Sequence, residues 1–284
     1  MPKSIEEVYW IVDEVVKSAK IGKISRPGRK PKMSPSEVVT LLVMGHLEGL
    51  TTTKQLHNSM FFRYRFCFKS IPSYAQFSRL VRSNEPALRC LIKLFCSIYA
   101  RKRALYYIID STSLPVAGYD TDKVKWIGDQ GGIGKNMHGW YHGFKLHIIV
   151  NHDLEIVSAT LTPANVHDLT PLKQTSFIEN IKGILVGDKG YQSAKVRAFL
   201  ASWGIDLLAK QRENMDPFLN IYFKRFFTAR RRIEGIFGYL KTKLAAIYRY
   251  ARSAEGFLSQ VQAAVLSYML KNFSEVDLPL EMPI

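Results

Sequence analysis

The sequence predicts an α/β fold preceded by an all-helical N-terminal part, and two observations carry this prediction. Over roughly the first hundred residues, apolar side chains recur at helical spacing. From about residue 104, short apolar runs rich in β-branched residues alternate with amphipathic helical segments, as in α/β folds. The 284 residues, 47% of them hydrophobic, suffice for two domains with sizeable cores. We place the boundary between residues 103 and 104.

The N-terminal domain, residues 1–103, is expected to consist of helices. The first covers Ile5–Lys20, where valines and isoleucines fall on one face. A polar, proline-containing linker follows it. The second helix is expected to begin at a cap formed by Ser34 or Ser36 and to end near Leu47.

Positive charge is concentrated in the same part of the chain. There are 40 Lys and Arg against 24 Asp and Glu, a formal charge of +16. Residues 1–104 hold 19 basic and 7 acidic residues (net +12), whereas residues 105–284 hold 21 and 17 (net +4). A basic surface attracts polyanions and releases their counterions on binding. The charge therefore indicates double-stranded DNA as partner; a solvated basic surface without such a partner is the alternative.

A helix-turn-helix is predicted at about residues 51–83, where two short helical segments follow each other. The second segment begins at Pro72-Ser73, and its polar face carries Gln76, Arg79 and Arg82. Such side chains can bind base edges or phosphates when a helix enters the major groove. Any amphipathic helix of a basic bundle has a similar pattern, so that alternative stays open.

Residues 104–284 are expected to form the second domain, a mixed five-stranded sheet with helices. Its predicted strands are the apolar runs ALYYIID, GFKLHIIVN, EIVSATLTP, GILVGD and GIDLLAK. Its predicted helices are DLTPLKQTSFIEN, SAKVRAFLASW and the long segment IYFKRFFTARRRIEGIFGYLKTKLAAIY. This order, β-β-β-α-β-α-β-α, is that of RNase H-like domains.

Three acidic residues occupy special points of this order. Asp110 ends the first predicted strand, Asp188 ends the fourth, and Glu234 lies in the last helix. Taken singly, the two aspartates could be turn or capping residues. Together, the three carboxylates suit divalent cations such as Mg²⁺, which prefer oxygen ligands and promote phosphodiester cleavage.

Five stretches of the second domain resemble transposases of the DDE type encoded by bacterial insertion sequences. They are IIDSTSLP, HGFKLH, TPANVHD, VGDKGY and RRRIEGIFGYLK. The resemblance extends over nearly the whole chain and is greatest to the IS982 family, which is related to the IS4 and IS5 groups. It implies an RNase H-like catalytic domain that cuts DNA with two Mg²⁺ ions, for which Mn²⁺ would substitute. It also implies that Asp110, Asp188 and Glu234 are the catalytic and metal-binding residues.

The helix around Glu234 carries a more specific match. The IS4 group has the pattern Tyr-x2-Arg-x3-Glu-x6-Lys, and this chain reads Phe227-x2-Arg230-x3-Glu234-x6-Lys241. On one helix the four side chains would share a stripe. Arg230 and Lys241 are expected to bind DNA phosphates, whereas Phe227 lacks the hydroxyl of the tyrosine. A solvated helix with an Arg230–Glu234 pair is the alternative.

A Gly-rich segment, residues 118–143, follows the first predicted strand. Lys123, Lys125, Trp126 and Lys135 in this segment are expected to contact a DNA end, with a plain surface loop as the alternative.

Other patterns are expected to carry no site. His142 and His147 would lie on opposite faces of a strand, which disfavours a zinc site. Asp168 is expected to cap a helix rather than to serve as an accessory acid. The three cysteines lack CxxC spacing, and no apolar run approaches the roughly 18 residues of a membrane span. We therefore expect a cytoplasmic, nucleoid-associated protein.

The sequence thus predicts a transposase. It would bind the terminal inverted repeats of an insertion sequence, cleave DNA and transfer the strand to target DNA, acting as a homodimer in a synaptic complex. Two alternatives use the same residues differently. One is a transposase-derived DNA-binding repressor without catalysis, and the other is a structure-selective nuclease that hydrolyses DNA without joining it.

Overall fold

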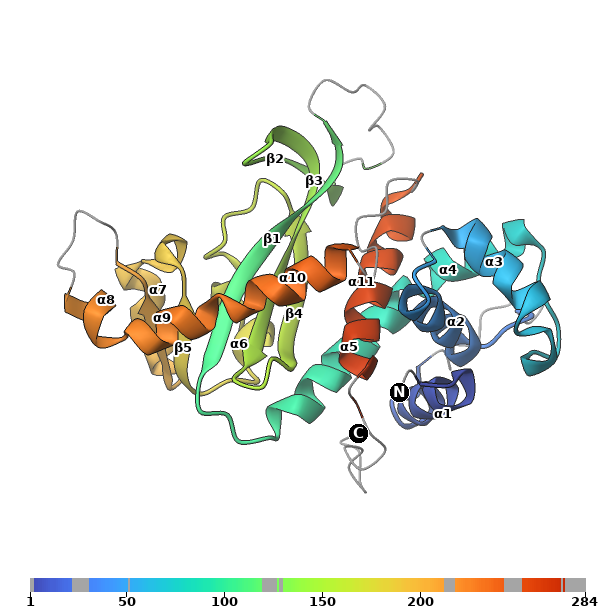
Figure 1. Ribbon diagram of the computed structural model, residues 1–284, viewed down its shortest axis with the longest axis horizontal. Helices are drawn as coiled ribbons and strands as arrows, with labels where there is room; N and C mark the ends of the chain where they lie inside the picture. The colour runs from blue at the N-terminus through green and yellow to red at the C-terminus, as the bar shows by residue number, and fades with distance from the viewer. Residues whose placement is uncertain are drawn as a thin grey trace. The chain divides into compact units, whose positions relative to one another are not determined.

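The computed structural model describes two compact units, each considered separately here (Figure 1). One comprises Met1–Leu94 with Tyr239–Ile284, and the other Phe95–Gly238. The described residues are 3–21, 31–50, 52–118, 127, 130–211, 218–242, 252–271 and 273. The division differs from the predicted boundary at 103/104, because the C-terminal helix α11 (Ala254–Lys271) packs on α2 and α4 of the N-terminal unit. That DNA binding belongs to residues 1–103 and catalysis to residues 104–284 stays a prediction.

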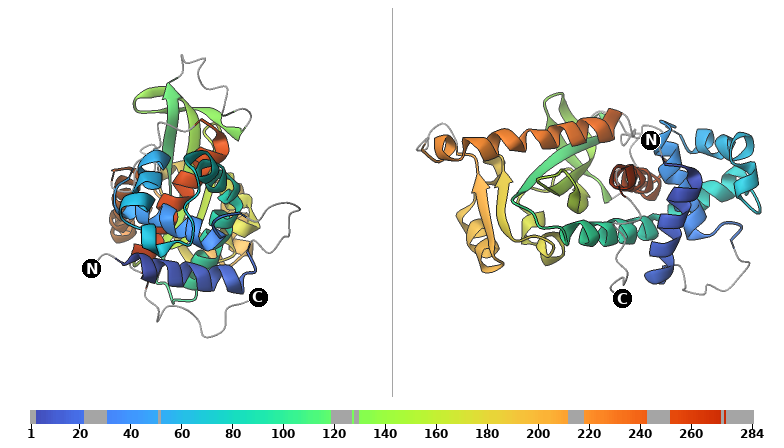
Figure 2. Two further views of the ribbon diagram at one scale, coloured as in Figure 1. Left: turned by 90° about the vertical axis from the view of Figure 1, so that its right-hand side faces the viewer. Right: turned by 60° about the horizontal axis from the view of Figure 1, so that its bottom comes forward.

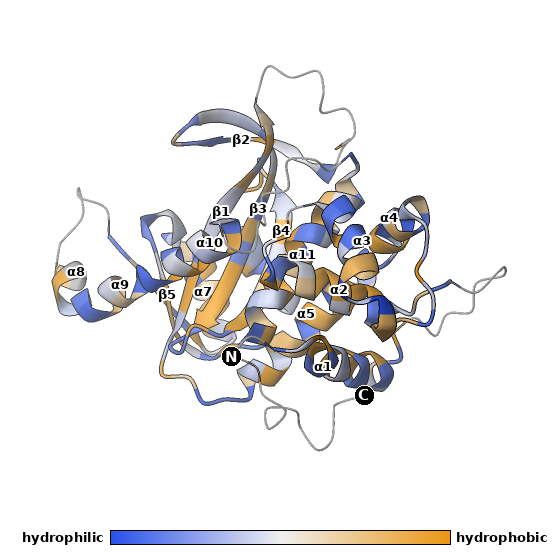
Figure 3. Ribbon diagram, turned by 45° about the vertical axis from the view of Figure 1, so that its right-hand side comes forward, coloured by the Kyte–Doolittle hydropathy of each residue, from blue (hydrophilic) through white to orange (hydrophobic). Residues whose placement is uncertain are grey.

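The first unit is built around two helices that are buried on most sides. α2 and α11 pack against each other, and the Ser267 hydroxyl of α11 donates a hydrogen bond to the carbonyl of Val43 (3.3 Å). In Figure 3, α1 shows both hydrophobic and hydrophilic residues, as expected for a helix with one buried face. The other helices are α1 (Ile5–Ser18), α2 (Pro35–Leu47), α3 (Thr53–Phe62), α4 (Tyr74–Ser83) and α5 (Glu85–Ala100, in this unit up to Leu94).

Capping boxes explain where four of these helices begin. Four cap side chains each accept a hydrogen bond from the third helical N–H: those of Ser4, Ser34, Thr52 and Ser73. The side chain of the Glu or Gln at that third position in turn accepts a hydrogen bond from the backbone N–H of the cap residue. Such a cap contributes about 1 kcal/mol. The predicted helix starts at Ser34 and at Pro72-Ser73 are confirmed. The connection between α3 and α4, residues 63–73, contains a 3₁₀ helix (Arg65–Cys67) and is longer than the 3–4-residue turn of a helix-turn-helix.

The second unit contains a mixed sheet of six strands, one more than predicted. β1 (Tyr107–Gly118), β3 (Gly139–Asn151) and β4 (Ile156–Pro163) pair antiparallel, whereas β5 (Gly183–Gly187) and β6 (Ile205–Ala209) continue the sheet in parallel from β1. The spatial order is β4-β3-β1-β5-β6, and the additional strand β2 (Gly132–Asn136) pairs with the first residues of β3.

β2 lies within the Gly-rich segment that we expected to be a loop. It forms a hairpin with β3 in which Asn136 faces Gly139. Gly139 has a φ of +112°, a conformation that a residue with a side chain rarely adopts. The turn therefore requires a glycine. Because glycine is also typical of loops, the sequence did not predict the strand β2.

Helices flank the sheet (Figures 1 and 2). In the right-hand view of Figure 2, α9 runs along one face. The predicted long basic helix is instead three segments, α8 (Phe218–Tyr222), α9 (Lys224–Arg230) and α10 (Arg232–Thr242). At the joint of α9 and α10, the amides of Arg231 and Glu234 bond to carbonyls three residues back, a tighter pattern than that of an α-helix. The remaining segments are 3₁₀ Pro171–Lys173, α6 (Thr175–Ile178), 3₁₀ Lys189–Tyr191 and α7 (Ala194–Ser202).

Within the described ranges, no helix combines the length and the apolar character needed to cross a membrane.

Candidate active site

Two parallel strands bring Asp110 and Asp188 to the same level of the sheet. In the β1–β5 pairing, Ile108 lies opposite Val186. Asp110 and Asp188 each follow two residues later, immediately beyond this last paired position. The register therefore places Asp110 and Asp188 at the same level of two neighbouring strands.

Asp110 is not a strand-end residue, which corrects the prediction. β1 continues to Gly118 because its whole length pairs with β3, and Asp110 lies opposite Ile148 in that pairing. Its Oδ1 accepts a hydrogen bond from the Ser111 amide (2.8 Å), and its Oδ2 accepts one from the Arg230 guanidinium (2.7 Å). The Asp110 side chain is 20% exposed.

Asp188 does follow the end of its strand, since β5 ends at Gly187. Its backbone is extended, and its carbonyl accepts a hydrogen bond from the Tyr191 amide (2.9 Å). This turn brings the Tyr191 ring into the protein, where it is 2% exposed. A Cβ at Gly187 would lie 3.0 Å from the same side chain, so the glycine lets the ring pack against the strand end.

Glu234 reaches Asp110 through Arg230. The Arg230 guanidinium donates one hydrogen bond to Asp110 Oδ2 and another to Glu234 Oε1 (3.1 Å). The Arg230 side chain is 13% exposed, whereas that of Glu234 is 59% exposed. The positive charge of Arg230 therefore offsets the negative charges of both carboxylates. The Glu234 carboxylate stays accessible from solvent.

Burial shapes the proton affinity of this site. Desolvation raises the pKa of Asp110, and the charge of Asp188 adds to this effect, while the Ser111 amide and Arg230 oppose it. Burial also raises the pKa of Tyr191 well above its usual value, and the carboxylates of Asp110 and Asp168 act in the same direction. Tyr191 is thus a neutral phenol beside the acids, and the Asp110 carboxylate would be stabilised by further positive charge.

The donor set suits a hard divalent cation. Asp110 and Asp188 offer carboxylate oxygens from adjacent strands, and a cation between them would relieve the repulsion that raises the pKa of Asp110. In the side-chain positions described here, no three His, Cys, Asp or Glu residues are grouped closely enough to hold a metal ion. Glu234 pairs with Arg230 instead. Its exposure leaves it free to change rotamer and join the two aspartates.

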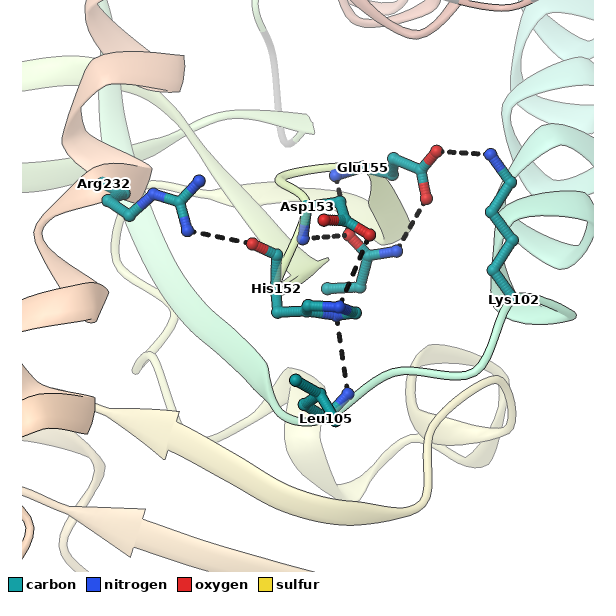
Figure 4. A network of polar contacts seen from close by, with 7 residues as sticks. Lys102, Leu105, His152, Asp153, Glu155 and Arg232 are labelled. Carbon is teal, nitrogen blue, oxygen red and sulfur yellow. Dashed lines mark hydrogen bonds and ion pairs between the residues drawn. The ribbon is translucent and has the colours of Figure 1, made fainter.

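A second contact fastens the helix that carries Glu234. Arg232 at the start of α10 donates a hydrogen bond to the carbonyl of His152 (3.0 Å) in the β3–β4 turn (Figure 4). That turn is itself braced, because the Asn151 side chain accepts hydrogen bonds from the amides of Asp153 and Glu155. Lys102 binds the Glu155 carboxylate (2.6 Å). The sheet thus holds both Arg230 and Arg232, on either side of the α9–α10 joint.

A polar cluster occupies the strands beside the aspartates. Lys145 on β3 donates hydrogen bonds to Asp168 (3.0 Å) and to the carbonyl of Val166 (2.8 Å). Asp168 is therefore an ion-pair partner, and the predicted helix cap at this position is wrong, because the following 3₁₀ helix is preceded by Thr170. His147 is fully buried and lies 2.8 Å from the Thr162 hydroxyl. Burial lowers the pKa of His147 to about 4, so it is a neutral packing residue at pH 7.

The other predicted contact residues are spread over the chain. Lys241 lies on α10, seven residues beyond Glu234, and burial lowers its pKa. Lys135 on β2 is exposed, with its ammonium 5.5 Å from the centre of the Trp140 ring. The remaining three residues of the Gly-rich segment, Lys123, Lys125 and Trp126, lie outside the described residues.

α4 presents the predicted DNA-reading residues in the first unit. Gln76, Arg79 and Arg82 are all exposed. Gln76 Oε1 accepts a hydrogen bond from the Ser73 amide (3.1 Å) as part of the cap, which leaves its amide nitrogen as the free group. Arg79 therefore has the freer side chain for base contacts.

Sequence reasoning missed three contributors to this site. Tyr191 belongs to the VGDKGY stretch but was not singled out; its aromatic character directly after a strand-end acid was the available signal. Arg232 and the Lys145–Asp168 pair gave no signal, because their partners are 80 and 23 residues distant in the chain.

A mixed sheet that brings two aspartates together, with an Arg-linked glutamate from a following helix, defines a carboxylate site suited to phosphodiester chemistry. Residues 101–253 match the family described as the transposase DDE domain, and the match covers more than half of the chain. The chain therefore belongs to the DDE-domain transposases.

No curated protein matches the sequence. Among solved structures, the chain is similar to the piggyBac transposase in a synaptic complex with hairpin DNA. The identity is 12% and the TM-score 0.40, over 94% of this chain and 80% of that chain.

Proposed function

We propose that this transposase cuts DNA at the terminal inverted repeats of an insertion sequence and joins the freed end to target DNA. The observation that carries the proposal is the level register of Asp110 and Asp188 together with the Arg230 bridge to Glu234. Asp110, Asp188 and Glu234 are then the catalytic acids. The strand order β4-β3-β1-β5-β6 supports an RNase H-like catalytic fold.

The three acids would hold two Mg²⁺ ions, with Mn²⁺ as a substitute. Bound there, the ions would supply activation of the attacking oxygen and stabilisation of the leaving oxygen. Asp110 and Asp188 are held by adjacent strands, which fixes their separation. Arg230 favours the ionised form of Asp110 and is hydrogen-bonded to Glu234. Tyr191 closes the site from the protein side as a neutral ring.

DNA would be held mainly by the N-terminal helices. The net charge of +12 over residues 1–104 supports this role, with α4 entering the major groove and Arg79 reading base edges. Lys241, Lys135 and Arg230 would bind DNA phosphates. Two ends must meet for transposition, which favours a homodimer. The matching stretches favour the IS982 family, and the spacing from Phe227 to Lys241 is that of the related IS4 group.

A cleavage and joining assay tests the proposal. A labelled duplex from the flank of the gene, which would contain the terminal repeat, is incubated with the protein, Mg²⁺ and an unlabelled target. We expect a cut at the repeat end and a labelled product joined to the target. Binding without a cut would instead identify a repressor, and a cut without joining would identify a nuclease.

A further inference from the structure

A pocket of about 490 Å³ lies in the first unit where three helices meet. The start of α3, one side of α4 and the start of α11 line it. α3 and α11 both begin here, so the positive ends of two helix dipoles face the same region. Its polar lining includes Lys54, Ser78, Arg82, Arg252 and Ser253.

The lining of this pocket is positively charged. Lys54, Arg82 and Arg252 line it, and no acidic residue does. All three side chains are exposed, and among the described residues none of them makes a hydrogen bond or an ion pair. Other cations of the same unit are neutralised: Lys17 pairs with Asp13 and Arg63 with Glu48. Three cations around one hollow favour an anionic ligand.

α11 approaches α4 at Gly256. A Cβ at this position would lie 3.0 Å from Ser253 Oγ and 3.8 Å from Arg82 Cγ. Ser253 Oγ in turn accepts a hydrogen bond from the Gly256 amide (3.1 Å), which caps α11. The stem of Arg82 therefore lies beside the first turn of α11.

α4 divides its side chains between two directions. Tyr74, Ser78, Val81 and Arg82 line the pocket, as residues at i, i+4, i+7 and i+8 of one helix should. Arg79 does not line the pocket and lies on the solvent side of the helix. Phosphate binding and base reading can thus be separated on one helix.

We infer that this pocket binds a phosphodiester group of the DNA backbone, and that the start of α11 thereby completes the DNA-binding surface of the N-terminal helices. The inference rests on the proposed function. The guanidinium groups of Arg82 and Arg252 suit phosphate oxygens, and Lys54 adds a third charge at the start of α3. This assigns Arg82 to backbone binding, and it gives the C-terminal segment a role in holding DNA.

The test measures DNA affinity as a function of salt for the full-length protein without divalent cations. Two duplexes of equal length are used, one with the terminal repeat and one of random sequence. Arg252→Gln is expected to weaken binding to both duplexes equally and to lower the salt slope by about one. Arg82→Gln is expected to do the same, and Arg252→Lys to keep the slope. Lys17→Gln, which removes an already paired cation, is the control.

Separate outcomes test the inference and the proposed function. If the wild type binds DNA and Arg252→Gln keeps its slope, the pocket does not bind the backbone. A loss confined to the terminal-repeat duplex would also overturn the inference, since it would mean base reading. If the wild type binds neither duplex, the proposed function itself fails. Melting temperatures equal to the wild type are expected for these exposed positions and show that the variants fold.

Free inorganic phosphate is the other source of this ligand chemistry. In DNA-free protein, sodium phosphate and sodium chloride are compared at equal ionic strength. We expect equal melting temperatures, because a backbone site is completed by neighbouring contacts along the DNA. Stabilisation by phosphate that Arg252→Gln abolishes, together with an unchanged DNA slope, would assign the pocket to a small anion instead.

Discussion

Asp110 and Asp188 occupy equivalent positions on two parallel strands, each two residues beyond the pair formed by Ile108 and Val186. The pairing, rather than a loop, sets the distance between the two carboxylates. Repulsion between them is one cause of the raised pKa of Asp110, and Arg230 counters it. The paired strands therefore hold two negative charges close together, and the positive charge of Arg230 reduces their repulsion.

Arg230 is expected to stabilise the site before any metal binds. Arg230→Gln would leave the Asp110 carboxylate, largely buried, without its guanidinium partner, and would raise the pKa of Asp110 further. We expect a loss of roughly 1–3 kcal/mol in the free energy of unfolding, measured by urea denaturation without divalent cations at pH 7. Arg231→Gln, at an exposed neighbouring position, is the matched control. Equal free energies of unfolding for the two variants would show that the Arg230 bridge does not contribute to stability.

His147 is expected to make stability depend on pH. Its folded-state pKa of about 4 lies below the unfolded value of about 6.5, so in between the unfolded chain binds a proton that the folded chain does not. This contribution is fully present above pH 6.5 and is lost as the pH falls towards 4.

The measurement compares melting temperatures of the wild type and His147→Gln from pH 7.5 to 4.5. The wild type should lose more stability over this range than the variant does. Parallel pH profiles would mean that His147 titrates normally in the folded protein.

Gly143 in the HGFKLH stretch is expected to be irreplaceable for packing reasons. A Cβ there would lie 2.3 Å from the backbone oxygen of Leu114, where β1 and β3 approach at an irregularity of their register. Gly143→Ala should lower stability by roughly 1–3 kcal/mol or more, since backbone atoms must move. Gly235→Ala on α10 meets no atom within 4 Å and should be neutral or stabilising by about 0.5–1 kcal/mol. Thermal unfolding of both variants tests this prediction. Equal changes in melting temperature would contradict the packing argument.

Arg79 is expected to read bases rather than hold the backbone. Arg79→Ala should reduce discrimination between terminal-repeat and random DNA by roughly 1–3 kcal/mol, measured from paired affinities at one salt concentration. Arg82→Gln, on the pocket side of the same helix, should weaken both affinities without changing their ratio. An equal loss on both duplexes for Arg79→Ala would reassign this residue to phosphate.

Local patterns predicted those parts of the molecule that local forces determine. The cap at Ser34 and the apolar runs of β3 to β6 are such cases, because one segment carries all the information. The strand β2 was missed, since its pairing needs the turn at Gly139 and the neighbouring strand. α11 was missed too: the last predicted helix ends at Tyr248, whereas Ser253 caps a further helix.

The sequence named the three acids of the candidate site as candidates, but it did not indicate their contacts. The family resemblance and the order of strands identified Asp110, Asp188 and Glu234 as candidates. The bridge through Arg230 to Asp110 joins residues 120 apart in sequence, so it depends on how α9 lies over the sheet. The sequence indicated the i, i+4 pair of Arg230 and Glu234. No local pattern indicated that the same guanidinium also forms an ion pair with Asp110.

The most direct test of the central claim is metal-dependent cleavage by single variants of the three acids. Asp110→Asn, Asp188→Asn and Glu234→Gln keep size and hydrogen-bonding shape but remove the anionic ligand. Asp206→Asn, on the exposed side of β6, is the control; Glu255 is less suitable because it begins α11 beside the proposed phosphate pocket. Cleavage of the labelled terminal-repeat duplex in Mg²⁺ is measured alongside binding without divalent cations. We expect all three variants to bind DNA and to lose cleavage by orders of magnitude while Asp206→Asn cleaves normally; undiminished cleavage by Glu234→Gln would contradict the assignment of this residue as the third acid.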